Sequence, residues 1–356
     1  MLTPASTNRS APFEVVTATR HDLADIAGFL VSVFGTNLPP RLLDLRFLEW
    51  KFFSERPDWA GARSYFVKQE QQLVAHVCVW PLTFVAGEKK IRSCHLIDWA
   101  ASPAAPGAGS VIYQHLMQLG GTAIAVGGSE YAQRVLPRLK FRPHGSLEVF
   151  ARVVRPWKQF RSRPRTSGWK DFARLARNTF WSLRSLPSDS DWSALSVARA
   201  DSRLDSMQVA LPLCCRTLKS ADVVNYILEC PAACCSLFYL LCGDRARGYF
   251  ILSQLGGQCR IADLYVGSEN ERDWRAGCRI AARTAAESPQ TCEIAAASSL
   301  PWLSRVLSED GFRLRHVKPV MLFDPESQFE NTPPGHIQMI DSDALFLGSH
   351  SDPFFT

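Results

Sequence analysis

The chain has 356 residues, 46% hydrophobic and 21% charged, which is typical of a folded protein with two domains and excludes a disordered chain. No stretch approaches the roughly eighteen consecutive apolar residues of a membrane-spanning helix, and the first residues lack the regions of a secretory signal, so we expect a cytoplasmic protein. The net charge of +6 is concentrated, because Arg152 to Arg184 holds ten Lys or Arg and one acid, Asp171, and so carries +9.

Nine of the eleven cysteines lie between Cys214 and Cys292. They include no CxxC pair, and no histidine lies among them, so the paired spacing of a structural zinc site is missing. We expect no metal and interpret the cysteines as reduced, mostly buried thiols that pack as small hydrophobic residues.

The first half predicts helices and strands in a fixed order, with turn-forming residues between them. The predicted elements are a helix at Leu42 to Phe52, strands at Ser64 to Lys68, Leu73 to Ala86 and Lys90 to Ala101, a helix at Gly109 to Leu119, a strand at Thr122 to Val126 and a helix at Ser129 to Leu139. An aromatic-basic pair, Phe141 and Arg142, then leads into a last strand.

The second half repeats this order, beginning from a similar segment that ends at Pro57 in the first half and at Pro231 in the second. Its predicted elements are a helix at Ala221 to Leu228, strands at Ser236 to Cys242, Gly248 to Leu255 and Gln258 to Val266, a helix at Glu271 to Glu287, a strand at Thr291 to Ala297 and a helix at Ser299 to Asp310. The matched order predicts two copies of one mixed α/β fold.

A basic segment connects the two copies. Within it, Trp169 to Leu186 has helical periodicity with one apolar face. Three interpretations are open: a helix clamped between the domains, a helix lying on an anionic membrane surface, or an electrostatic contact with nucleic acid. No DNA or RNA recognition motif accompanies the segment, so we expect no specific nucleic acid. After Phe323 we expect the chain to wrap the surface.

A tight glycine-containing loop joins the strand that ends at Ala101 to the next helix. Such a junction presents unpaired backbone N–H groups and the positive end of a helix dipole, which suits a pyrophosphate, although an ordinary strand-to-helix turn has the same sequence signal. The candidate cofactor-binding residues are Trp99, Ala100, Ala101, Pro106, Gly107, Ala108, Gly109, Ser110 and Val111.

This part of the chain resembles the GNAT (GCN5-related) N-acetyltransferase superfamily, whose loop is Gln/Arg-x-x-Gly-x-Gly/Ala and whose fold ends in Gly-Phe. The resemblance rests on the loop Ala104 to Gly109, on the helix, strand and helix that follow it, and on Leu139-Lys140-Phe141. Gly311-Phe312 matches that ending in the second copy. The resemblance implies two tandem GNAT-like acyl-CoA N-acyltransferase domains with a mixed sheet, at 1–155 and 194–330, joined by a basic amphipathic linker at 156–193 and followed by a tail at 331–356. It also implies acetyl-CoA (coenzyme A) as the cofactor of the first domain.

Three departures from the family pattern stand out. Ala104 replaces the Gln or Arg that opens the loop, and Leu136 replaces the frequent acid tyrosine. In the second copy, Val266 to Asp273 has no Gly-x-Gly and is acidic where a diphosphate would lie. We therefore interpret that copy as unable to bind the cofactor, and its role is either to shape the acceptor pocket or purely structural.

The family mechanism needs a base for the attacking amine and an acid for the departing thiolate. The family's carboxylate position corresponds to His95, which is suited to act as a base near neutral pH or, alternatively, is a hydrogen-bonded strand residue. Asp98 lies nearby but alternation places it on the other side of the strand. Tyr131 is the candidate acid, with helix packing or a surface position as the alternative.

These residues predict a bacterial-type acyltransferase that transfers an acyl group from acetyl-CoA to an amine of a small molecule or sugar precursor. Two alternatives remain. Fem-type aminoacyl transferases also contain tandem copies of this fold, and the basic connector favours them. A non-catalytic scaffold in polysaccharide or envelope biosynthesis is favoured by the missing Gln or Arg and the missing tyrosine.

Overall fold

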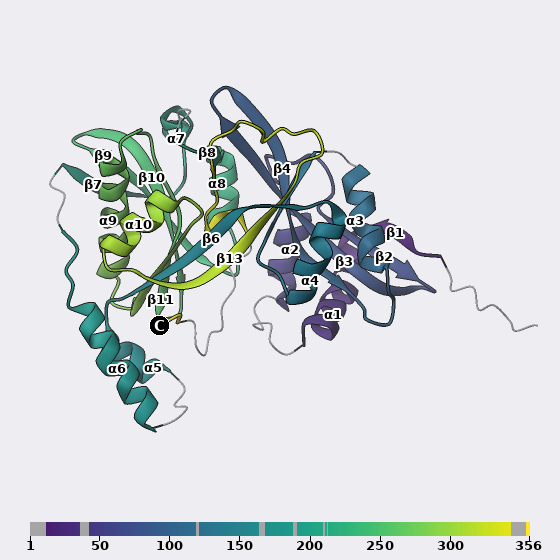
Figure 1. Cartoon of the computed structure of the whole chain (residues 1–356), viewed down its shortest axis with the longest axis horizontal. Coiled ribbons are helices and arrows are strands. Elements are labelled where there is room, and N and C mark those ends of the chain that lie inside the picture. Colours follow the sequence, from purple (N-terminus) through teal and green to yellow (C-terminus); the bar gives the residue numbers. More distant parts are fainter. Residues whose placement is uncertain are drawn as a thin grey trace, which may run out of the picture.

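A computed structural model describes residues 12–35, 43–118, 121–163, 168–187, 191–208, 211, 213–342 and 354–356. Within these residues the strands form one 14-stranded sheet whose main path runs β1-β2-β3-β4-β5-β13-β6-β12-β11-β10-β9-β7, with β8 and β14 attached beside it. Helices cover both faces, and the two halves lie side by side along the sheet (Figure 1).

The first half begins with a strand and two helices that precede the central strands. Its elements are β1 (Glu14–Thr17), α1 (Leu23–Phe34), α2 (Leu45–Phe53), β2 (Ser64–Gln69), β3 (Gln72–Ala86), β4 (Lys89–Ala101), α3 (Ala108–Gln118), β5 (Thr122–Val126), α4 (Glu130–Val135) and β6 (Arg142–Val153). Two connecting helices follow, α5 (Pro156–Ser162) and α6 (Gly168–Ser182).

The second half repeats the pattern. Its elements are β7 (Trp192–Val197), α7 (Ser202–Met207), β8 (Cys215–Thr217), α8 (Ala221–Leu228), β9 (Cys234–Cys242), β10 (Arg245–Leu255), β11 (Gln258–Val266), α9 (Glu271–Glu287), β12 (Glu293–Ser298), α10 (Pro301–Glu309), β13 (Arg313–Phe323) and β14 (Gly335–His336). The predicted order of elements is confirmed in both halves, and side-chain caps from Ser220 and Asn270 explain why α8 and α9 begin where the sequence predicts.

The last strands of the two halves are exchanged. β13 pairs antiparallel with β5 of the first half, while β6 pairs antiparallel with β12 of the second half, and β6 and β13 pair with each other. Figure 1 shows these two strands crossing the middle of the molecule. Each half therefore completes its sheet with a strand from the other, so the halves form one continuous core.

The faces of the first half are covered by different helices. α3 packs with residues such as Val77 and Leu96 on one face, while α2 packs with Cys78 and Ile97 on the opposite face. On that second face α2 meets its counterpart α8, where Trp50 stacks on Tyr226 with ring centroids 4.6 Å apart and the Trp50 Nε1–H donates to the Tyr226 carbonyl (3.2 Å).

Residues 324–334 lie mostly at the surface, as their composition predicts, but the described residues that follow lie inside the molecule, contrary to that expectation. Residues 335–342 are all buried. The backbone N–H groups of Phe355 and Thr356 donate to the carboxylate of Glu293 at 2.8 and 2.9 Å. Polar tail residues enter the core here because a buried carboxylate and exposed backbone edges give them partners.

The cysteines of the described residues are free thiols, and most are buried. In the same residues no group of three or more His, Cys, Asp or Glu has an arrangement able to hold a metal ion. None of the described helices is long and apolar enough to cross a bilayer.

Candidate functional site

β4 and β5 diverge in the middle of the first half. They pair in parallel only from Ser93 to His95, opposite Thr122 to Ile124, yet β4 runs on to Ala101. A β-bulge falls in this unpaired part, where β4 carries one more residue than β3 and Asp98 has φ +49°. Since a bulge bends a strand and increases its twist, it directs the end of β4 away from β5 and leaves a gap in the strand pairing beside β4.

The glycine loop continues from that end of β4. Gly107, at φ +97°, is exposed and begins the first turn of α3. A Cβ on Gly109 would lie 3.2 Å from the Ala101 Cβ, so this glycine lets α3 approach the end of β4 closely. Glycine is therefore favoured at the two positions for different reasons: Gly107 has a positive φ, and Gly109 lies in close contact with β4.

The loop offers fewer free amides than the sequence predicts. The N–H groups of Ser110 and Val111 already donate to the Gly107 carbonyl, at 2.9 and 3.0 Å, and that of Ala108 donates to Ala105 (3.2 Å). Among the described residues, the N–H groups of Gly107 and Gly109 have no acceptor. The loop thus presents two donors at a helix amino terminus, an arrangement that still suits an anion.

His95 and Asp98, two of the candidate catalytic residues, lie at the start of the gap. The Val126 N–H of β5 donates to Nε2 of buried His95 at 3.3 Å, so the neutral ring carries its proton on Nδ1. Asp98 turns its carboxylate toward Lys51 of α2, 2.6 Å away. Strict alternation, which would put Asp98 on the face opposite His95, fails because of the bulge.

A buried histidine supports this bulge. The Nδ1–H of His76 donates to the Asp98 carbonyl (3.2 Å), and its Nε2 accepts from the Ser64 hydroxyl (3.0 Å). Complete burial lowers the pKa of His76 to about 4, so the ring is neutral and the two hydrogen bonds fix its tautomer.

Tyr131, the third candidate, lies apart from the other two. Its side chain is 71% exposed near the start of α4, and no contact in the described part of the chain joins it to His95 or Asp98. Leu136, at the family's tyrosine position, is buried.

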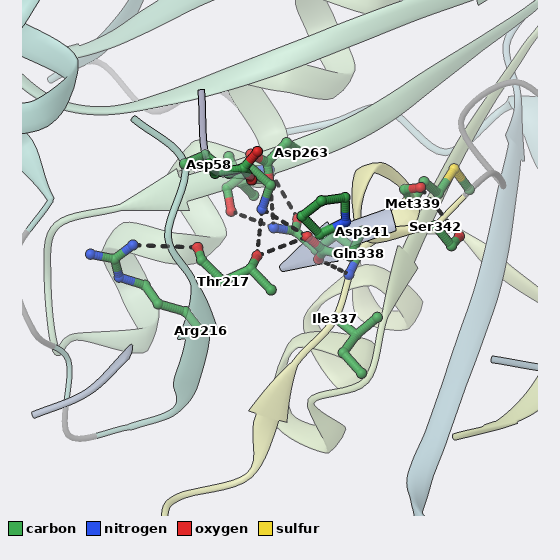
Figure 2. Close-up of polar contacts among 12 residues, drawn as sticks. Asp58, Arg216, Thr217, Asp263, Ile337, Gln338, Met339, Asp341 and Ser342 are labelled. Atoms are coloured by element: carbon green, nitrogen blue, oxygen red, sulfur yellow. Dashed lines mark hydrogen bonds and ion pairs between the residues drawn. The ribbon is translucent and has the colours of Figure 1, made fainter. Parts of the chain in front are cut away.

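The second half has an equivalent gap, and the chain fills it. β11 pairs with β12 only from Gln258 to Ile261, with a bulge before Asp263. Figure 2 shows Gln338 of the carboxyl-terminal segment entering this region. Its amide Oε1 accepts from the Leu264 N–H (2.9 Å), and its Nε2 donates to the Leu264 carbonyl (3.1 Å).

The position equivalent to Leu264 in the first half is Trp99, six residues beyond the first paired residue in each strand. No side chain of the described residues bonds the backbone of Trp99. The indole Nε1–H of Trp99 instead donates to the Gly109 carbonyl (3.2 Å), which holds α3 against β4. A peptide-like amide therefore occupies the gap of the second half, whereas no equivalent side chain from the described ranges does so in the first half.

A charged cluster anchors the inserted segment, and Thr217 donates to Asp341 within it (Figure 2). Lys219 lies 2.9 Å from Asp341 of the segment and 3.6 Å from Asp263 of β11. Counted from the first residue that pairs in parallel, Asp263 occupies the same position in β11 as Asp98 does in β4. Each of the two aspartates lies near a bulge and against a buried lysine. Burial raises the pKa of Asp263, and the nearby Lys219 opposes that rise.

Sequence reasoning missed Lys51, Lys219 and Gln338. The two lysines come from segments distant in sequence, and nothing in their local pattern marks them as buried. One signal of these buried ion pairs was present in the sequence, because Asp98 and Asp263 occupy the same position when the two copies are aligned.

No protein-family model and no curated protein sequence matches the chain. Several solved structures, in contrast, are similar to it. A GCN5-related N-acetyltransferase from Anabaena variabilis is 14% identical, with a TM-score of 0.60 over 87% of this chain and 72% of that one. The N-myristoyltransferase of Saccharomyces cerevisiae with bound myristoyl-CoA is 13% identical, with a TM-score of 0.57 over 89% and 85%. A GCN5-related N-acetyltransferase from Kribbella flavida is 16% identical, with a TM-score of 0.50 over 88% and 72%. The chain therefore has the GNAT fold, and at these identities the likeness establishes the fold alone.

Proposed function

We propose that the first half is an acyl-CoA-dependent N-acyltransferase, most simply one that uses acetyl-CoA, and that it acylates an amine of a small molecule or sugar precursor by direct attack. The observation that carries the proposal is the gap between β4 and β5, which opens beside the glycine loop. Solved structures with the same fold include acetyltransferases and an acyl-CoA complex, which supports this donor class.

The residues of the gap fit such a donor through backbone groups. The free N–H groups of Gly107 and Gly109, at the amino terminus of α3, are suited to a diphosphate. The unpaired edge of β4 is suited to an amide-containing arm, since Gln338 bonds the equivalent edge of β11 through an amide. When bound, acyl-CoA supplies an acyl group activated as a thioester.

His95 is the proposed base. It lies where β4 and β5 separate, and its Nε2 lone pair accepts a long, weak hydrogen bond of 3.3 Å from the Val126 N–H. Taking a proton from the amine requires that this bond be given up, which a long hydrogen bond permits at small cost. Tyr131, exposed near the start of α4, is the proposed acid, and positioning of the reactants alone supplies part of the rate.

Calorimetry with acetyl-CoA and longer acyl-CoAs tests the proposal. We expect binding of at least one donor by the wild type and its loss in Gly107→Leu, because a side chain at this exposed loop position would cover the two free N–H groups. Gly87→Leu is the matched control: Gly87 also has positive φ, at +60°, and has nothing within 4 Å of an added Cβ. Equal loss in both variants, or no heat with any acyl-CoA at millimolar concentration, contradicts the proposal.

Two other functions give different results in the same samples. A Fem-type aminoacyl transferase would bind aminoacylated RNA in a salt-dependent manner without needing Gly107. A scaffold would bind neither donor. The glycine loop and the open gap favour the acyl-CoA donor over both.

A further inference from the structure

The two connecting helices form a hairpin outside the sheet. α5 and α6 pack on each other and α6 lies along β6, and Figure 1 shows them extending from the lower left of the molecule. They belong to neither repeated half, and nothing in the proposed acyl transfer uses them.

α6 is turned with its polar side inward. Asn178 Nδ2 donates to Gln159 Oε1 of α5 at 2.9 Å, and Gln159 Nε2 donates to Glu293 of β12 at 3.1 Å. Both amides are almost completely buried. These bonds fix the rotation of α6 about its axis, so its orientation is a built feature of the fold.

The apolar side of α6 consequently faces solvent. Spacings of three and eight residues place these side chains on one stripe of the helix. The stripe consists of Trp169 (72% exposed), Phe172 (63%), Phe180 (71%) and Leu183 (75%). On α5, Trp157 stacks on Phe160, which in turn contacts Phe172, so the apolar surface continues across both helices. The clamp interpretation is therefore wrong, because it requires this side to be buried between the domains.

The surface around the stripe is positively charged. Lys158, Arg161, Lys170 and Arg184 are exposed on the two helices or just beyond them. The one acid, Asp171, is buried and lies 3.5 Å from Arg174. A cationic rim next to exposed tryptophan, phenylalanine and leucine is the arrangement of a helix that lies in the interface of an anionic bilayer.

We propose that this α5–α6 surface docks the protein on an anionic lipid membrane, with the stripe inserted among the headgroups and the basic side chains on lipid phosphates. A second copy of the chain fits less well, because two such surfaces would bring their positive charges together. The proposal is independent of the acyl-transfer function.

Flotation of the full-length protein with vesicles tests it, using phosphatidylcholine alone and phosphatidylcholine with 30% phosphatidylglycerol. We expect binding to the anionic vesicles that weakens in 0.5 M NaCl. The variant Phe172→Ser, Phe180→Ser, Leu183→Ser should lose at least about 1,000-fold in partition coefficient, since each of the three large apolar side chains contributes about tenfold or more. Lys170→Gln with Arg184→Gln should lose about 25-fold, or about fivefold for each charge.

Matched controls change the same residue types elsewhere. Leu195→Ser with Val317→Ser removes exposed apolar side chains of β7 and β13, and Lys90→Gln with Arg92→Gln removes exposed charges of β4. Both controls should bind as the wild type does, and circular dichroism should show every variant folded.

Three results would overturn the proposal. The wild type fails to float with anionic vesicles, or the triple serine variant floats equally well, which would reveal mere electrostatic adhesion. The third is a wild-type dimer in light scattering that the triple variant converts to a monomer, which would assign the surface to a second copy.

Discussion

Removal of the Lys219 charge tests whether the carboxyl-terminal segment is a structural part of the second half. Lys219 is buried between two carboxylates, 2.9 Å from Asp341 and 3.6 Å from Asp263. Lys219→Met keeps the bulk of the side chain and leaves both carboxylates without their cation. The expected result is a large loss of stability.

The size of that loss follows from the distances. At an effective dielectric constant of about 20, each contact is worth roughly 5 kcal/mol before the cost of desolvation is counted. Breaking a buried ion pair by removing one partner costs about 3–5 kcal/mol, and we expect about 4 kcal/mol at pH 7.

The loss should depend on pH. Burial already raises the pKa of Asp263 in the folded protein, and removal of Lys219 raises it further. The folded variant then binds more protons than the unfolded chain above about pH 4, so lowering the pH from 7 to 5 should recover part of the lost stability. Asp341→Asn in the same background should recover part of it at pH 7.

Urea denaturation followed by tryptophan fluorescence at pH 7 and pH 5 measures both effects. A loss below 1 kcal/mol at pH 7 would refute the reasoning, as would an equal loss at both pH values. Either result would mean that water or movement of the segment neutralises the two carboxylates.

Two further predictions concern the first half. Lys140→Gly should stabilise the protein by about 0.5–1 kcal/mol in urea denaturation. Lys140 has φ +67° at the end of the turn after α4, and this left-handed conformation is unfavourable for any residue with a Cβ. An unchanged urea midpoint would contradict this prediction. The wild type should lose about 3 kcal/mol of stability from buried His76 as the pH falls from 6.5 to 4, because its folded pKa is lowered to about 4 and the unfolded chain takes up the proton first. His76→Gln should lack this share of the pH dependence, and identical profiles for the two proteins would rule out the assigned cause.

Local signals in the sequence predicted the elements well. Periodicity, turn residues and caps are local properties, and they placed α8, β5, β11 and α9 at the boundaries that the structure has. The internal repeat added the order of the strands, because two copies with equal spacing constrain each other. The glycine loop was also located correctly, since positive φ at Gly107 is a local requirement.

Long-range features escaped sequence reasoning. The exchange of β6 and β13 leaves each strand with the same alternation it would have in an unexchanged sheet, so no local pattern distinguishes the two arrangements. Gln338 lies in a Pro- and Asp-rich segment that composition assigns to the surface, yet its side chain completes the edge of β11. The partners of such residues are determined only by the folded sheet.

Comparison of the two halves also bears on which candidate residues serve catalysis. Asp98 and Asp263 occupy the same position in β4 and β11 and each lies against a buried lysine, although Lys51 lies within α2 and Lys219 precedes α8; Asp263 lies beside a gap that the chain itself closes. A feature present in both halves cannot be what separates a binding gap from a closed one, so we assign the Asp98 carboxylate to holding α2 against the bulge. His95 is different, because the equivalent residue is Arg260, which cannot act as a base near neutral pH. The difference between the halves therefore lies in His95, the glycine loop and the unfilled edge of β4, and these are the features through which the first half should be tested.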